Sequence, residues 1–225
     1  MCMFPISDSI KTFRFPYFNT FIIFLTVYVF LQEFLAPDAT VFINNYALIP
    51  VNVNMSDFRT FAPFVTAIFL HGGFIHILSN MWFLWVFGDA VEIALPPPLF
   101  LLLYIAAGVV GNFIQYSFMP GSQIPMLGAS GAVAGILGSY YILFTYSKVK
   151  TLVFIFIFIT IIEISAPLML GYWFALQLFS GVISFPGTEN QGGIAFFAHI
   201  AGFITGMVIA SIIKNTPLVK SVEAD

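Results

Sequence analysis

Long stretches without a formal charge are the feature of this sequence that most limits what it can fold into. The longest runs from Ile93 to Ser147, and two others cover residues 15–32 and 60–88. Only 8% of the 225 residues are charged and 60% are hydrophobic, whereas about a quarter of the residues of an ordinary soluble domain are charged. A surface this apolar would not stay dispersed in water. The sequence therefore predicts one integral membrane domain.

Turn residues divide the charge-free stretches into helices. A helix needs about 20 mostly apolar residues to cross the hydrocarbon core, and the turn residues MPGSQIP at 119–125 split the longest stretch into a helical hairpin. Residues 151–162 are either a buried segment or the start of a helix, and Glu163 and Pro167 interrupt them. We expect an all-α polytopic membrane protein, a six-transmembrane-helix bundle with helices near 15–34, 74–94, 99–118, 128–147, 167–184 and 193–213.

The distribution of basic residues predicts the orientation of this bundle. The expected domain covers residues 1–213, and residues 214–225 form a short polar tail. With six helices, every Lys and Arg except Arg59 falls on the side that holds both termini. Short cytoplasmic loops are enriched in Lys and Arg, so both termini are expected in the cytoplasm, beneath a plasma (inner) membrane. The long first loop, residues 35–73, is rich in aromatic and aliphatic residues and is expected to lie in the membrane interface.

Charge and composition also bear on partners. The formal net charge is −3, and no cluster of basic residues occurs, so nucleic acid is not an expected partner. The lipid bilayer is the expected surrounding, no cofactor is implied, and the sequence predicts no oligomeric state.

Polar residues inside a membrane are costly and are therefore candidates for function. In the predicted topology, the helices that contain His76, Ser130 and His199 all run in the same direction, and each of these residues lies in the first two turns. Three residues far apart in the sequence are thus expected at one depth. His76 and Asn80 are four residues apart and share a helix face. The complete set of such polar residues is His71, His76, Asn80, Asn112, Gln115, Ser130, Glu163, Gln177 and His199.

Small residues predict that the helices of Ser130 and His199 pack closely. Gly202 and Gly206 have the GxxxG spacing that lets a neighbouring backbone approach, and they share a face with His199. Small residues surround Ser130 in the same way. The set is Gly128, Gly131, Ala134, Gly135 and Gly138.

A serine hydroxyl beside an imidazole is the minimum unit for nucleophilic catalysis, because a base must take the hydroxyl proton. Asp89 and Glu92 are predicted at the opposite membrane face, so a dyad of Ser130 and His199 is expected rather than a triad. An oxyanion needs hydrogen-bond donors. The amide of Ser130 at the start of a helix, the side chains of His76 and Asn80, and a backbone amide presented at Gly128 are the candidates.

Three segments of the sequence resemble the signature segments of the rhomboid intramembrane proteases. They are HGGFIHILSNMWFLWVFGDAVE at 71–92, GASGAVAG at 128–135 and AHIAGFITG at 198–206, and the resemblance extends from about Phe58 to Ile213. It implies that Ser130 is the nucleophile, that His199 is the base, and that His76 and Asn80 line the oxyanion site. It also implies cleavage of single-span membrane proteins near the outer membrane face.

Two positions depart from the pattern of that family. The Trp-Arg pair common in the first loop is Phe58-Arg59 here, which is a conservative change. Ala134 stands where many relatives carry an aromatic residue beneath the histidine, so the support of His199 is left open.

Three other functions fit parts of the sequence. A transporter or channel would suit six spans with polar midsections, but no internal repeat is visible. A metal-dependent intramembrane enzyme would use the histidines, but the HExxH spacing is absent, so no metal site is expected. An inactive relative that binds client helices would not need both Ser130 and His199. Asn112, Gln115 and Gln177 are interpreted as structural hydrogen-bonding groups.

Overall fold

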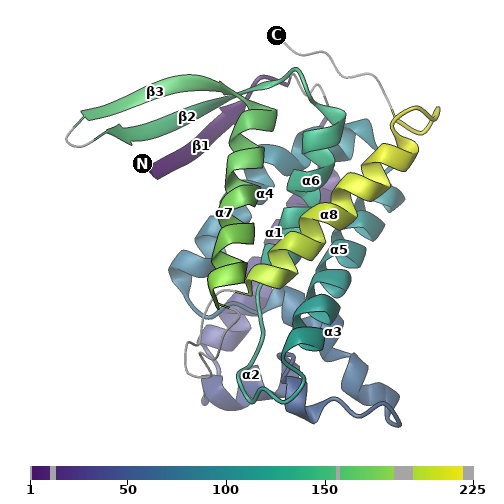
Figure 1. The fold of residues 1–225 in the computed structure, drawn as a ribbon. Helices are drawn as coiled ribbons and strands as arrows, with labels where there is room; N and C mark the ends of the chain where they lie inside the picture. The colour runs from purple at the N-terminus through teal and green to yellow at the C-terminus, as the bar shows by residue number, and fades with distance from the viewer. Residues whose placement is uncertain (1, 11–13, 156–157, 185–194, 220–225) are drawn as a thin grey trace.

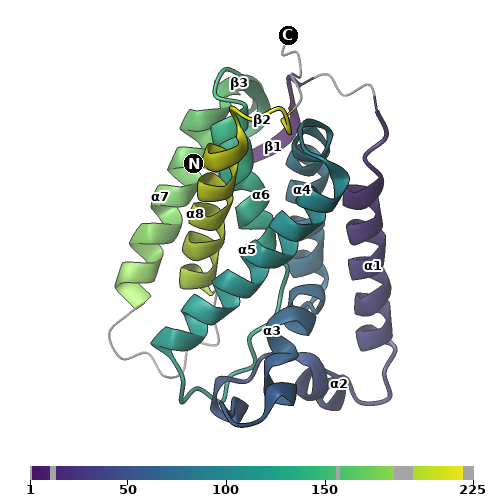
Figure 2. The same cartoon turned by 90° about the vertical axis from the view of Figure 1, so that its right-hand side faces the viewer.

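A computed structural model describes residues 2–10, 14–155, 158–184 and 195–219 of the chain. The protein is mostly helical, and its long helices form a bundle with a small sheet at one end (Figure 1). Two shorter helices, α2 (Ala39–Tyr46) and α3 (Pro63–Thr66), lie at the other end (Figure 2). The helices of the bundle are α1 (Tyr17–Phe34), α4 (Phe74–Ala94), α5 (Pro97–Phe118), α6 (Ser130–Leu143), α7 (Ala166–Ser184) and α8 (Phe196–Ile213).

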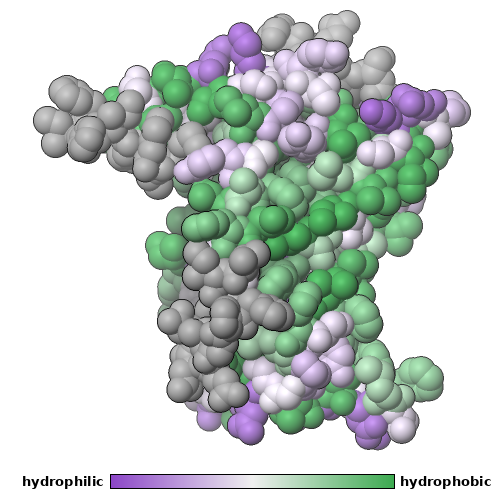
Figure 3. All heavy atoms as spheres, in the orientation of Figure 1, coloured by the Kyte–Doolittle hydropathy of each residue, from purple (hydrophilic) through white to green (hydrophobic). Residues whose placement is uncertain are grey.

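Four of the described helices are long and apolar enough to cross a membrane: α1, α4, α5 and α8. Hydrophobic residues cover the middle of the face seen in Figure 3, and hydrophilic residues gather above and below them. The chain is therefore an integral membrane protein with several membrane-spanning helices. That α6 and α7 also cross, which would make six spans, stays a prediction.

Helix α6 is shorter than the predicted helix at 128–147. Its 14 residues extend about 21 Å, less than the roughly 30 Å of the hydrocarbon core. The segment before it is extended and pairs Met126 with Leu48 through both backbone hydrogen bonds, at 3.0 and 2.8 Å. Ser130 therefore begins a helix inside the bundle. The predicted start of the last helix at 193, and the end of the tail from 220, lie outside the described residues.

Three strands form an antiparallel sheet that the all-α expectation does not include. The sheet has the order β1 (Cys2–Asp8), β2 (Lys148–Ile155) and β3 (Phe158–Ser165). The described residues of the segment 151–162, expected as a buried segment or the start of a helix, lie in strands β2 and β3. Its Ile, Val, Thr and Phe residues favour strands, and β1 supplies the third strand that a hairpin needs for stability. Figure 1 shows β2 and β3 projecting sideways from this end of the bundle, past α7.

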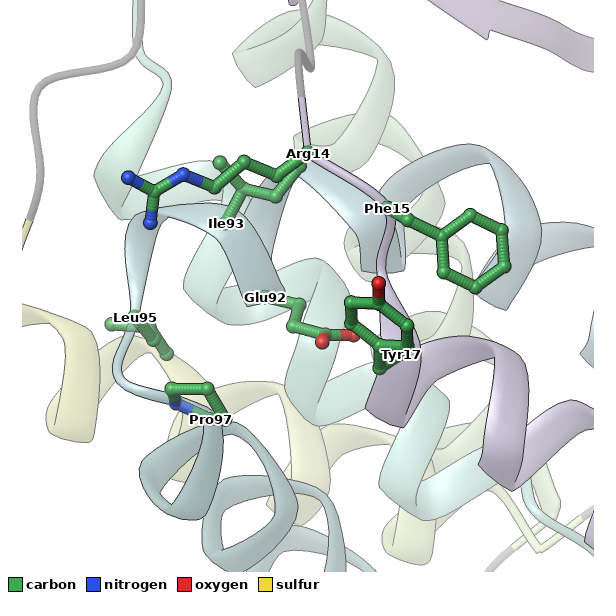
Figure 4. A pocket seen from close by; sticks show the side chains of 7 residues that line it. All are labelled: Arg14, Phe15, Tyr17, Glu92, Ile93, Leu95 and Pro97. Atoms are coloured by element: carbon green, nitrogen blue, oxygen red, sulfur yellow. The ribbon is translucent and has the colours of Figure 1, made fainter.

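The amino end of α1 is held by a carboxylate from α4. Glu92 accepts hydrogen bonds from the backbone N–H groups of Phe18 (3.0 Å) and Asn19 (2.6 Å), which are otherwise unpaired at a helix start. Figure 4 shows Glu92 beside an open cavity that is also lined by Arg14 and Tyr17. This cavity lies at the end of α4 opposite to His76. The carboxylate of Glu92 thus joins α4 to the start of α1.

The segment between α1 and α4 packs on the bundle through its own apolar cluster. Leu48, Phe64 and Ala67 are buried together, and Asn112 of α5 donates a hydrogen bond to the Phe64 carbonyl at 2.9 Å. The segment is therefore folded onto α5 and leads to the turn at which α4 begins.

Candidate active site

Helices α6 and α8 touch through their backbones along a seam of glycines. A Cβ atom added to Gly202 would collide with the carbonyl oxygen of Gly131, and one added to Gly206 would collide with that of Gly135. Gly138 faces the carbonyl of Phe203 in the same way. No side chain fits at these positions, so the GxxxG spacing serves close helix packing.

The glycine seam leads to a prediction about stability. Gly206→Ala is expected to lower the thermal stability of the purified protein, because the new methyl group must separate α8 from α6, and overpacking of this kind costs about 1–3 kcal/mol. Gly171→Ala in α7 is the matched control: its Cβ would meet only the ring of Tyr141, at 3.9 Å. Melting curves in detergent measure both variants. Equal melting temperatures for Gly206→Ala and the wild type would contradict the seam as described.

Ser130 and His199 lie at the same end of this seam. Helices α4, α6 and α8 all begin toward the end of the bundle where α2 and α3 lie and run toward the sheet (Figure 1). Ser130 is the first residue of α6, and His199 lies in the first turn of α8. The carbonyl oxygen of Ala198 is 3.4 Å from the position that a Cβ on Gly131 would take, so the chain neighbours of both residues are in contact.

The side chains of Ser130 and His199 differ in their exposure to solvent. Ser130 is half-buried, and His199 is buried, with 8% of its surface exposed. Among the described residues, Ser130 and His199 form no hydrogen bond with each other. Catalytic hydrogen bonds are often long in the absence of substrate and tighten when it binds.

His76 of α4 lies against the turn that precedes Ser130. A Cβ on Gly128 would be 2.8 Å from Cε1 and 2.9 Å from Nε2 of the His76 ring, and Gly128 has a φ of 124°, which disfavours other residues. Glycine is required here for both reasons. The N–H of Gly128 donates to the carbonyl of Ala67 at 2.9 Å, so it is already engaged. Gly128 thus contributes space for His76.

A chain of buried hydrogen bonds holds Asn80 beside the same turn. The side-chain amide of Asn80 lies 3.0 Å from Nε2 of His71, and the backbone N–H of Ala129 lies 3.5 Å from the same nitrogen. The carboxylate of Glu33, from α1, accepts the backbone N–H of His71 at 3.1 Å. Burial and the nearby His76 lower the pKa of His71 to about 3, so His71 is neutral and its Nε2 accepts both bonds.

The support of His199 comes from α7. Its Nδ1 is 2.8 Å from the side-chain oxygen of Gln177, and the ring of Trp173 lies 6.1 Å away at an interplanar angle of 33°. Ala134 is fully buried in α6 and places no ring beneath the histidine. An aromatic ring thus packs near His199, but it comes from α7 and not from position 134 of α6, where the family pattern would place it.

The other polar residues of the predicted set bind backbone groups or lie far from this site. Asn112 holds the Phe64 carbonyl, and Gln115 accepts the N–H of Phe197 at 3.1 Å. Glu163 forms an ion pair with Lys148 at 3.7 Å in the sheet. Sequence reasoning did not single out the roles of Glu33 and His71, because their bonds join segments that no motif links.

Comparisons with known proteins identify the family of the chain. The family model of the Rhomboid domain matches residues 59–216. The chain is similar to rhomboid protease GluP of Bacillus subtilis, with 34% identity over 65% of this chain and 25% of that protein. It is also similar to the mitochondrial presenilin-associated rhomboid-like protein A of Danio rerio, with 28% identity over 70% of this chain and 40% of that protein.

A shorter match, of 40% identity, covers 34% of this chain and 38% of the putative rhomboid protease YdcA of Bacillus subtilis. The matched part of the chain thus spans between a quarter and two fifths of these relatives. The matching region of the family model contains α4, α5, α6, α7 and α8, and with them Ser130, His199, His76 and Asn80. The chain belongs to the rhomboid family.

Proposed function

We propose that this protein is an intramembrane serine endopeptidase that uses Ser130 as nucleophile and His199 as general base. The observation that carries the proposal is the glycine seam between α6 and α8, which sets the first residue of one helix beside the first turn of the other. The similarity to proteins named rhomboid protease supports the reaction class.

In the proposed reaction, the Ser130 hydroxyl attacks the carbonyl carbon of the scissile peptide bond. His199 takes the hydroxyl proton at Nε2 and passes it to the leaving amine when the C–N bond breaks. Water then attacks the resulting acyl-enzyme, His199 takes a proton from that water, and the proton returns to Ser130 as the ester breaks. Because Nδ1 of His199 faces Gln177, Nε2 is the nitrogen left for this transfer.

The oxyanion that forms during attack is proposed to be stabilised by groups from α4 and α6. An asparagine amide carries two hydrogens; one is bonded to His71, which leaves the other for the oxyanion. The N–H of Ser130 is the second donor and benefits from the helix dipole. His76 is the third, and Gly128 serves the site by leaving room for the His76 ring.

Transmembrane proteins that cross the bilayer once are the proposed substrates, cleaved near the outer face. The start of α6 inside the bundle supports a site below the membrane surface. We place the protein in the plasma (inner) membrane with both termini in the cytoplasm and six spans, on the basis of the Lys and Arg distribution.

The proposed orientation predicts which loops are accessible from each side. In a Cys2→Ser background, Tyr146→Cys is expected to react with an impermeant maleimide only from the cytoplasm, and Gln123→Cys only from outside. Both side chains are exposed, so each position should react readily once the reagent reaches it. Labelling of intact cells and of inverted vesicles gives the measurement, and the reverse pattern would overturn the placement of the site.

Covalent labelling tests the proposed activity directly. A serine-directed fluorophosphonate is expected to modify purified protein at Ser130, and only when His199 is present. Peptide mapping by mass spectrometry identifies the labelled residue. Labelling at another residue would reject the assignment.

A further inference from the structure

Gln177 makes a specific contact with the proposed base. Its side-chain oxygen lies 2.8 Å from Nδ1 of His199, and the two residues belong to different helices, α7 and α8. His199 is buried and Gln177 is half-buried, so the bond is shielded from most competing water.

The chemistry of the amide decides which imidazole nitrogen carries the proton. A side-chain carbonyl oxygen can only accept hydrogen bonds, so Nδ1 of His199 must be the donor and Nε2 must hold the free electron pair. We propose that Gln177 is a positioning residue that fixes this tautomer and the ring orientation, so that Nε2 faces Ser130. This role rests on the proposed serine-protease function. In this role Gln177 is the third member of the catalytic unit, the place for which only acidic residues were considered from the sequence.

Carboxylates on the described helices and strands do not take this place; Asp8 of β1, for example, accepts a hydrogen bond from the hydroxyl of Tyr140. Glu92 is bound to the start of α1 at the opposite end of the bundle, and Asp89 lies one turn before it in α4. Glu33 is bonded to the backbone of His71. Glu163 pairs with Lys148 in the sheet. An amide can orient a catalytic histidine without a charge, as asparagine does in other nucleophilic proteases.

Trp173 strengthens the case, because it lies one helical turn before Gln177 on the same helix. Its ring packs near His199, at 6.1 Å between centroids, and near Phe203, at 6.0 Å. One face of α7 thus makes two contacts with His199. Trp173 packs near the imidazole ring, and Gln177 bonds to its Nδ1. The position of α7 therefore sets the orientation of the base.

Variants of Gln177 separate a positioning role from simple packing. Gln177→Leu is expected to lower kcat by about 10-fold to 100-fold with little change in KM, because the loss of the acceptor leaves the tautomer unfixed. Gln177→Glu keeps an acceptor at Nδ1 and is expected to recover most of the activity at high pH. Its carboxylate stabilises the imidazolium, so the acid limb of the kcat/KM profile should move to higher pH.

Measurements use full-length protein in detergent micelles, with a single-span substrate and with the rate of fluorophosphonate labelling of Ser130. Leu178→Ala is the matched control, since Leu178 is exposed on the same helix. It is expected to keep the wild-type pH profile and labelling rate. Ser130→Ala is assayed in parallel: if it still cleaves, the proposed function fails.

The inference about Gln177 fails on its own if Ser130→Ala is inactive but Gln177→Leu shows wild-type kcat. It also fails if Gln177→Leu and Gln177→Glu lose activity equally and the acid limb stays in place, which would indicate packing alone. If Gln177→Leu does not fold, the pH profile of Gln177→Glu decides: a shifted acid limb supports the positioning role, and an unshifted one overturns it.

Discussion

Ser130→Ala is expected to abolish cleavage of a single-span membrane substrate, and His199→Ala is expected to do the same. Each variant removes one half of the proposed nucleophile and base pair, so kcat should fall by about 10⁴ to 10⁶. The double variant should be no worse than either single variant, because members of a catalytic unit are not additive. Expression and melting temperature should stay close to those of the wild type.

Ser117→Ala is the control for this experiment. Ser117 is a serine of α5 whose hydroxyl donates only to the carbonyl of Phe113, at 2.8 Å, and its replacement should leave cleavage unchanged. Cleavage is followed by the appearance of the amino-terminal product in detergent micelles and in liposomes. Substantial residual cleavage by Ser130→Ala would disprove its role as nucleophile.

The second large effect is expected at Asn80. If its free amide hydrogen binds the oxyanion, its benefit appears chiefly in the transition state, where the negative charge develops. Losing one such donor costs about 10² to 10³ in kcat, or about 2.7–4 kcal/mol. Asn80→Ala should therefore lower kcat strongly, leave KM nearly unchanged, and leave Ser130 reactive toward a fluorophosphonate. His76→Ala should act likewise, with added loss of packing against Gly128.

Two comparisons make the Asn80 experiment decisive. Asn112→Ala removes a buried asparagine that binds the Phe64 carbonyl in another helix, and it should reduce the melting temperature more than kcat. Assays with and without EDTA separate the serine reaction from a metal-dependent one, in which His76 would be a ligand. Inhibition by the chelator that zinc restores would reject the serine mechanism, and an Asn80→Ala variant with full kcat would remove Asn80 from the oxyanion site.

The helices of the bundle can be predicted from the sequence, because the length of an apolar stretch and the turn residues that end it are local features. The helix at Phe74–Ala94, for instance, begins directly after Gly72 and Gly73, which interrupt the charge-free run 60–88. The sheet was not predicted, because β1 lies at the amino end and pairs with a strand that comes after α6. A short apolar run of Ile, Val and Phe fits a buried helix or a strand equally well until its partner is known.

The same distinction applies to the site. The small residues around Ser130 and His199 predict close packing of two helices, and the contacts of Gly202 and Gly206 agree with it. The bonds of Gln177 to His199 and of Glu33 to His71 depend on how neighbouring helices are rotated about their axes. Spacing within one helix does not specify that rotation, so these partners emerge only from the three-dimensional arrangement.

The strand at the amino end has a consequence for how the protein is made. β1 pairs Met3 with Val153, and Tyr140 of α6 donates a hydrogen bond to Asp8 at 2.8 Å. During synthesis, β1 is produced long before its partner strand, and it has to wait while α1, α4, α5 and α6 are produced. The sheet can therefore form only after most of the bundle has been produced, and it then joins residues 2–8 to residues 148–155.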